Sequence, residues 1–209
     1  MKIGMILDSV YPDDARVTNQ CDELIKKNHE IHLFCLSFSH VFVENEVINK
    51  INIHRYYCSK ITYKLSALAN DINLYNNILK NKIIDFLRKT NVDILHIHDI
   101  QIAQAAISAS NIFNIKYNID LHENRPEIMK FYKHVNSFFG KIFISPARWK
   151  IAEEKFVKSA NKVIVVTKHA KKELLSRVNI NEQKVIVYPN TVRKDFYENK
   201  PIDKNLEKK

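Results

Sequence analysis

The chain has 209 residues, of which 45% are hydrophobic and 27% are charged, a composition that is ordinary for a soluble globular protein. No uninterrupted apolar run is long enough to cross a bilayer, and the first residues run directly into a predicted strand. We therefore expect neither a membrane span nor a signal peptide. Three cysteines without a C-x-x-C pair favour reduced thiols in a cytoplasmic protein over a zinc site or a disulfide framework.

The formal net charge of +10 raises the question of an anionic partner. Basic residues are denser at 80–88, 130–158 and 168–177, but none of these stretches is a run of five like charges, and no aromatic-basic nucleic-acid signature is present. We expect no nucleic-acid partner. An anionic membrane surface is the better interpretation, with the protein peripheral on the inner face of the plasma membrane. A compositional drift toward lysine explains the same charge without any partner.

Apolar patterns predict strands and helices that alternate along the first half of the chain. A buried strand at 2–7 precedes a helix at 15–27, with Asp13 or Asp14 as its N-cap. A second strand covers 30–36, and 41–57 holds one or two irregular strands. A long helix follows from 66 to 90. The opening strand, loop and helix lack the G-x-G-x-x-G fingerprint, so a dinucleotide site there is not expected.

The second half continues the alternation. A strand at 93–97, an Ala-rich helix and a strand at 116–121 form a βαβ unit of roughly 30 residues, which predicts parallel strands. Helices are predicted around 131–135 and over 148–160 and 169–177, and strands at 162–166 and 184–188. The apolar stretch 138–144 fits no element clearly. The pattern predicts an α/β fold: a doubly wound, mostly parallel Rossmann-like sheet of six or seven strands with helices on both faces. We expect this domain at 1–192 and a linker or tail at 193–209.

Two strands of the central unit end in a histidine followed by a carboxylate, His98-Asp99 and His122-Glu123. Parallel strands end at one edge of the sheet, where open α/β folds bind their ligands, so we expect all four side chains on a common rim. A neutral imidazole at His122 can exchange hydrogen bonds with a hydroxyl; a loop histidine bonded to nearby backbone is an equal alternative. A metal at His96 and His98 is less favoured, since the sequence offers no third ligand nearby.

The chain resembles the N-terminal domain of a retaining glycosyltransferase of family 4, which has the GT-B fold. Five segments carry this resemblance in order: the stretch 14–33, Asp93-Ile-Leu-His-Ile-His98-Asp99, Asp120-Leu-His122-Glu123, Ser159-Ala-Asn-Lys-Val-Ile-Val-Val-Thr167, and Lys184-Val-Ile-Val-Tyr-Pro-Asn190. The resemblance implies a two-domain enzyme in which this half binds the acceptor and the other binds a nucleotide-sugar. It also implies sugar transfer to a hydroxyl with retention, as in the synthesis of cell-surface polysaccharide or glycolipid precursors.

The resemblance implies the site residues as well. His122, with Glu123 beside it, is the expected catalytic position facing the donor sugar. Expected substrate-binding residues are Asp13, Asp14, Arg16, His98, Asp99, Asn124, Arg125, Thr167 and Asn190. No metal and no cofactor other than the nucleotide-sugar donor are expected. The partners are a sugar or lipid-linked acceptor and a donor domain, in cis or as a separate chain.

Two departures limit what the resemblance implies. The Gly-Gly loop common after the first strand of the family is replaced by residues 9–14, and the family's E-x7-E pair belongs to the other domain. We therefore expect the isolated chain to be inactive. Three alternatives stay open: a stand-alone acceptor-binding or scaffolding subunit of a two-chain transferase, a non-catalytic Rossmann-like binding module, and an unrelated flavodoxin-like or epimerase-like protein.

Overall fold

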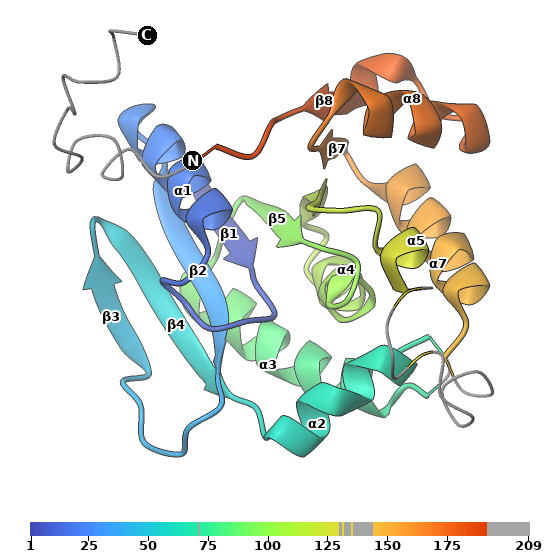
Figure 1. Cartoon of the computed structure of the whole chain (residues 1–209). Helices are drawn as coiled ribbons and strands as arrows, with labels where there is room; N and C mark the ends of the chain where they lie inside the picture. The colour runs from blue at the N-terminus through green and yellow to red at the C-terminus, as the bar shows by residue number, and fades with distance from the viewer. Residues whose placement is uncertain (71, 130, 132–134, 136–143, 192–209) are drawn as a thin grey trace, which may run out of the picture.

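The computed structural model describes residues 1–70, 72–129, 131, 135 and 144–191. Over these residues the chain forms one eight-stranded sheet in the order β3-β4-β2-β1-β5-β6-β7-β8 (Figure 1). Every neighbouring pair is parallel except β3 with β4. The strand order reverses beside β1, so the carboxyl ends of β1 and β5 flank the crevice where sheets of this type bind ligands.

The amino-terminal elements follow the predicted alternation closely. They are β1 (Lys2–Ile6), α1 (Ala15–Lys26), β2 (Glu30–Ser37), β3 (Asn45–Ile48) and β4 (Ile51–Tyr57). Asp14 is the N-cap of α1, because its carboxylate accepts a hydrogen bond from the backbone N–H of Val17 at 3.0 Å. An acceptor at this position satisfies one of the free N–H groups of the first helical turn.

The sheet has eight strands, whereas the sequence predicted six or seven. The segment expected to hold one or two irregular strands forms the antiparallel hairpin of β3 and β4. Its two turn residues, Asn49 and Lys50, have positive φ angles of 50° and 66°. This is the conformation that a two-residue hairpin turn needs. The hairpin adds β3 as an antiparallel edge strand to an otherwise parallel sheet.

The long helix predicted over 66–90 is divided. A short helix α2 (Lys60–Lys64) and the 3-10 turn η1 (Leu65–Leu68) come first, and α3 begins only at Leu74 and ends at Thr90. The expected apolar stripe holds within α3, where Tyr75, Leu79 and Ile83 are fully buried, whereas Ile72 is 48% exposed. The side chain of Asn76 donates to the carbonyl of Ala69 and ties α3 to the preceding turn.

The carboxyl-terminal elements confirm the predicted order of strands and helices. They are β5 (Ile94–His98), α4 (Ala103–Ile112), β6 (Lys116–Leu121), α5 (Arg125–Met129), α7 (Pro146–Ser159), β7 (Lys162–Val165), α8 (Lys168–Arg177), η2 (Glu182–Lys184) and β8 (Val185–Val187). The predictions for 131–135 and 138–144 fall mostly outside the described residues. The proposed tail at 193–209, and with it the boundary at 192, lies outside them completely.

Two hydrophobic cores cover the two faces of the sheet. Successive residues of β1 point to opposite faces: Met5 packs with Val17 of α1 in one core, and Ile6 packs with Leu79 of α3 in the other. This alternation is the ordinary geometry of a strand, and burial on both faces explains why the parallel strands are almost continuously apolar. Among the described residues, no helix is both long and apolar enough to span a membrane.

Candidate functional site

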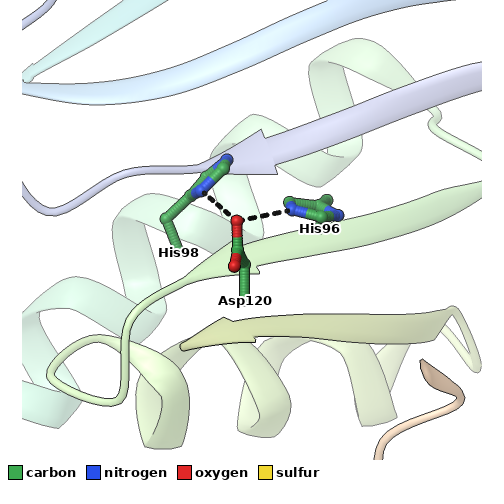
Figure 2. A group of neighbouring side chains, drawn as sticks. All are labelled: His96, His98 and Asp120. Carbon is green, nitrogen blue, oxygen red and sulfur yellow. Dashed lines mark ion pairs between the residues drawn. The ribbon is translucent and has the colours of Figure 1, made fainter. Parts of the chain in front are cut away.

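The carboxyl ends of β5 and β6 bring polar side chains together, as the parallel arrangement predicts. His98 and Asp120 are direct neighbours in the register of the two strands. Figure 2 shows the ring of His98 beside the Asp120 carboxylate, with His96 on its other side. Asp120 was not among the residues predicted for the site, yet its carboxylate is the centre of the cluster.

The Asp120 carboxylate is fully buried and bound by α1. Arg16 donates from Nε to Oδ2 at 2.9 Å and from Nη2 to Oδ1 at 2.6 Å. Gln20, one helical turn later, donates to Oδ2 at 2.6 Å. Burial alone would raise the pKa of Asp120, but His96 and the Arg16 guanidinium outweigh it and hold the pKa well below its usual range. Asp120 is therefore an anion whose charge is neutralised within the protein.

Three imidazoles surround the same carboxylate. The nearest ring nitrogens of His96, His98 and His122 lie 3.6–3.7 Å from Oδ2 of Asp120, and Nδ1 of His98 lies 3.1 Å from Nε2 of His122. Burial lowers the pKa of His98 well below 6.5, and the neighbouring His96 and His122 lower it further. His98 is therefore neutral at physiological pH.

The cluster has the donor types of a metal site. Ligand atoms of His96, His98 and Asp120 lie within 4.8 Å of one another, so the structure supplies the third ligand that the sequence did not reveal. The guanidinium of Arg16 nevertheless occupies both oxygens of Asp120, and a bound cation would have to displace it against charge repulsion. The expectation of a site without metal stays a prediction.

The burial of His98 contradicts one expectation from the sequence. The sequence analysis placed it on the rim, but its side chain is 0% exposed, so it is not positioned to touch a substrate. His122, by contrast, keeps 20% of its side chain exposed and lines a cavity of about 520 Å³. The buried ring of His98 contacts the partly exposed ring of His122, at 3.1 Å between Nδ1 and Nε2.

The cavity beside His122, which we call the α1 cleft, is formed by segments far apart in the sequence. Its lining residues are Ser9, Val10, Asp13, Asp14, Ala15, Arg16, His122, Asn190 and Thr191. Asp13 and Asn190 are exposed. Arg16 also donates from Nη1 to the carbonyl of Tyr188 at 2.8 Å and to Oδ1 of Asn190 at 2.9 Å. Arg16 thus fixes the segment after β8 against α1, and its expected contact with a substrate stays a prediction.

Glu123 and Asn124 do not share the α1 cleft with His122. Both line a separate, smaller pocket against α7 and α8, together with Glu153 and Arg177. The expected catalytic pair His122 and Glu123 is therefore divided between two cavities. The structure thus corrects the expectation that the two act together.

Asp99 and Arg125 form a third group at the same edge of the sheet. Arg125 donates from Nη1 to Oδ2 of Asp99 at 2.5 Å, and Oδ1 of Asp99 accepts from the backbone N–H of Ile100. Asp99 has a positive φ of 67°, which aspartate tolerates better than most residues. Neither residue lines the α1 cleft; their expected contact with substrate stays a prediction.

Asp8, close to this group, was missed by the sequence analysis. The residue is 9% exposed, and Oδ2 has no hydrogen-bond partner among the described residues. Burial and the charge of Asp99 raise the pKa of Asp8 to about 7, although Arg125 lowers it. The available signal was its place directly after β1, on the edge where β5 and β6 also end.

Thr167 has a structural position. Its hydroxyl accepts from the backbone N–H of Ala170 at 3.0 Å and caps α8, and it is not part of the α1 cleft lining. Helix capping, which its position before a predicted helix already suggested, accounts for this threonine. Its expected role in substrate binding stays a prediction without support from this geometry.

Comparison with known proteins concerns the chain as a whole. The model of the family described as Glycosyltransferase Family 4 matches residues 15–196. No curated protein matches the sequence.

Solved structures share the fold. Sucrose-phosphate synthase from Thermosynechococcus elongatus has 12% identity and a TM-score of 0.66, with 90% of this chain and 47% of that chain covered. An E. coli structure described as trehalose-6-phosphate bound with UDP-2-fluoro glucose has 13% identity and a TM-score of 0.59, covering 90% and 48%. A UDP-N-acetylglucosamine 2-epimerase described as putative, from Listeria monocytogenes, has 17% identity and a TM-score of 0.58, covering 89% and 44%.

These likenesses establish the architecture, and the chain spans about half the length of each solved structure. Because an epimerase and a synthase match with similar scores, the fold alone does not separate transferases from epimerases. The family model covers most of the sequence. On this ground the chain belongs to Glycosyltransferase Family 4.

Proposed function

We propose that this chain is the acceptor-side half of a glycosyltransferase that moves a sugar from a nucleotide-sugar to a hydroxyl group. The observation that carries the proposal is the α1 cleft: it opens at the carboxyl edge of a parallel sheet, and His122 lines it opposite the first turn of α1. Family membership supplies the reaction class, and the cleft supplies a place for one substrate.

The charges of the cleft favour a hydroxyl-rich acceptor. Asp13 and Asp14 line it as carboxylates, while the charge of Arg16 is neutralised by Asp120. The cleft wall is therefore acidic, and an acidic wall accepts hydrogen bonds from sugar hydroxyls and repels a phosphate. We place the acceptor here and assign the diphosphate of the donor to the second half of the enzyme.

The remaining parts of the proposal rest on the family. Retention of configuration, a donor-binding half in cis or on a separate chain, and the absence of a cofactor other than the nucleotide-sugar are properties that we infer for the complete enzyme. The chain covers under half of each of the three solved structures described above, which supports a second half. The isolated chain is then expected to transfer nothing.

An anionic membrane surface is a further part of the proposal. On α7, Ile151 is 68% exposed and lines a hollow together with Glu154, Lys155, Lys158 and Ser159. An exposed apolar residue beside lysines suits the face of a membrane that carries a lipid-linked acceptor. We infer from this that the protein works on the cytoplasmic side. Co-sedimentation with anionic vesicles should fall as salt rises and should weaken in Lys155→Glu/Lys158→Glu. Binding that is absent or indifferent to salt contradicts this part.

The cleft assignment can be tested on the chain itself. Amide chemical shifts of the 15N-labelled protein are followed while a panel of mono- and disaccharides, and separately a panel of nucleotide-sugars, is added. We expect an acceptor sugar to shift residues around Asp13, His122 and Asn190. Shifts confined to other regions, or none with any sugar, contradict the assignment. Conversion of UDP-N-acetylglucosamine to its 2-epimer would instead favour an epimerase.

A further inference from the structure

The two ring nitrogens of His122 have different surroundings. Nε2 points inward, 3.1 Å from Nδ1 of His98 and 3.6 Å from Oδ2 of Asp120. No group in the described part of the chain bonds Nδ1, and the ring lines the α1 cleft. The inner nitrogen is thus held by the protein, and Nδ1 is left for a ligand.

The proton on the inner contact can belong to either histidine. His98 is neutral and carries one ring proton, and its Nε2 is buried without a partner in the described residues. If that proton sat on Nε2, a buried N–H would lack an acceptor, which is rare in proteins. If it sits on Nδ1, the N–H donates to His122 and only a lone pair is left unpaired.

Asp120 does not compete for this proton. Its Oδ2 is 3.7 Å from Nδ1 of His98, beyond hydrogen-bond distance. The same oxygen already accepts from Nε of Arg16 at 2.9 Å and from Gln20 at 2.6 Å. The nearest acceptor for the Nδ1 proton of His98 is therefore Nε2 of His122.

We propose that His98 is a positioning residue that fixes the tautomer of His122, so that neutral His122 accepts at Nε2 and presents an Nδ1–H to the cleft. In this state His122 is a hydrogen-bond donor toward an oxygen atom of the ligand and is not a general base. This deepens the proposed function, since a hydrogen-bond donor at this point suits an oxygen of the acceptor sugar. A base at the same point would instead take a proton from the acceptor hydroxyl.

The test is the protonation state of each nitrogen of His122. Two-bond 1H–15N correlation spectra of the full chain, with 15N-histidine and at a pH about two units above the ordinary histidine pKa, separate protonated from bare ring nitrogens. The His122 signals are identified by their loss in His122→Gln. We expect Nδ1 protonated and Nε2 bare. The reverse pattern overturns the proposal, and no substrate is needed, so the result is independent of the proposed function.

Two variants separate positioning from packing. His98→Asn keeps an amide N–H close to the place of Nδ1, whereas His98→Phe keeps a ring without a donor. We expect Asn to preserve the Nδ1–H tautomer of His122 and Phe to shift it toward Nε2–H. An unchanged tautomer in a folded His98→Phe protein contradicts the proposal. If that variant does not fold, the wild-type spectrum alone decides.

Discussion

Arg16 of α1 and Asp120 at the end of β6, 104 positions apart in the chain, form a buried two-point ion pair. Arg16 also binds the segment after β8 through the carbonyl of Tyr188. One guanidinium therefore joins the first helix, the middle of the sheet and its last strand. The shape of the α1 cleft depends on this contact, because α1 and the residues after β8 form two of its walls.

Replacement of Arg16 by methionine should destabilise the protein strongly. Removing one partner of a buried pair leaves the other charge unpaired, and the free energy of unfolding should fall by about 3–5 kcal/mol. Denaturant unfolding followed by circular dichroism measures this loss. Lys26→Met is the control, since it removes an ion pair that is 60% exposed on the same helix and should change little. Equal losses in the two variants would contradict the role of Arg16.

The raised pKa of Asp8 predicts that the stability of the protein depends on pH. Its pKa rises from 3.8 to about 7 on folding, so the folded protein holds the proton more tightly than the unfolded chain. The contribution of Asp8 to stability is then complete below pH 3.8 and is lost as the pH rises to about 7, by at most about 4 kcal/mol. In Asp8→Asn this loss is absent.

The measurement is the free energy of unfolding of wild type and Asp8→Asn across that pH range. The variant should be the more stable of the two near neutral pH. Its advantage in the free energy of unfolding should shrink as the pH falls toward 3.8. A difference that does not vary with pH would show that the pKa of Asp8 is the same in the folded protein and in the unfolded chain.

The variant Thr167→Ala distinguishes a structural role of Thr167 from a role in substrate binding. In Thr167→Ala the first turn of α8 loses its cap at Ala170, and the free energy of unfolding should fall by about 1 kcal/mol. Sugar binding, followed by the chemical shifts around His122, should stay as in wild type. Weaker sugar binding at unchanged stability would show that Thr167 takes part in substrate binding.

The sequence predicts the sheet well because strand ends are visible in it. Apolar runs that stop at His98 and His122 place both residues on one edge, and the structure confirms this placement. How deeply each histidine is buried was not predictable from the pattern, because residues at the end of a strand can lie either in the interior or at the surface. His98 falls inside, whereas His122 reaches the cleft.

Long-range partners account for the rest of what the sequence did not predict. No local pattern connects Arg16 with Asp120, because the contact arises only when α1 packs against the finished sheet. The same holds for Asp8, whose raised pKa comes from burial and from Asp99 on a neighbouring strand end. The divided positions of His122 and Glu123 were not predictable either, because the pocket of Glu123 forms only when α7 and α8 pack beside it.

The most direct test of the account compares His122→Ala with Glu123→Gln in the complete enzyme, this chain together with its donor-binding half. Because His122 lines the α1 cleft and Glu123 faces the other pocket, sugar transfer should lose kcat on the order of 10²-fold or more in His122→Ala. Glu123→Gln should stay near wild type. A near-wild-type rate in His122→Ala, or a larger loss in Glu123→Gln, would contradict the placement of the reaction at the α1 cleft.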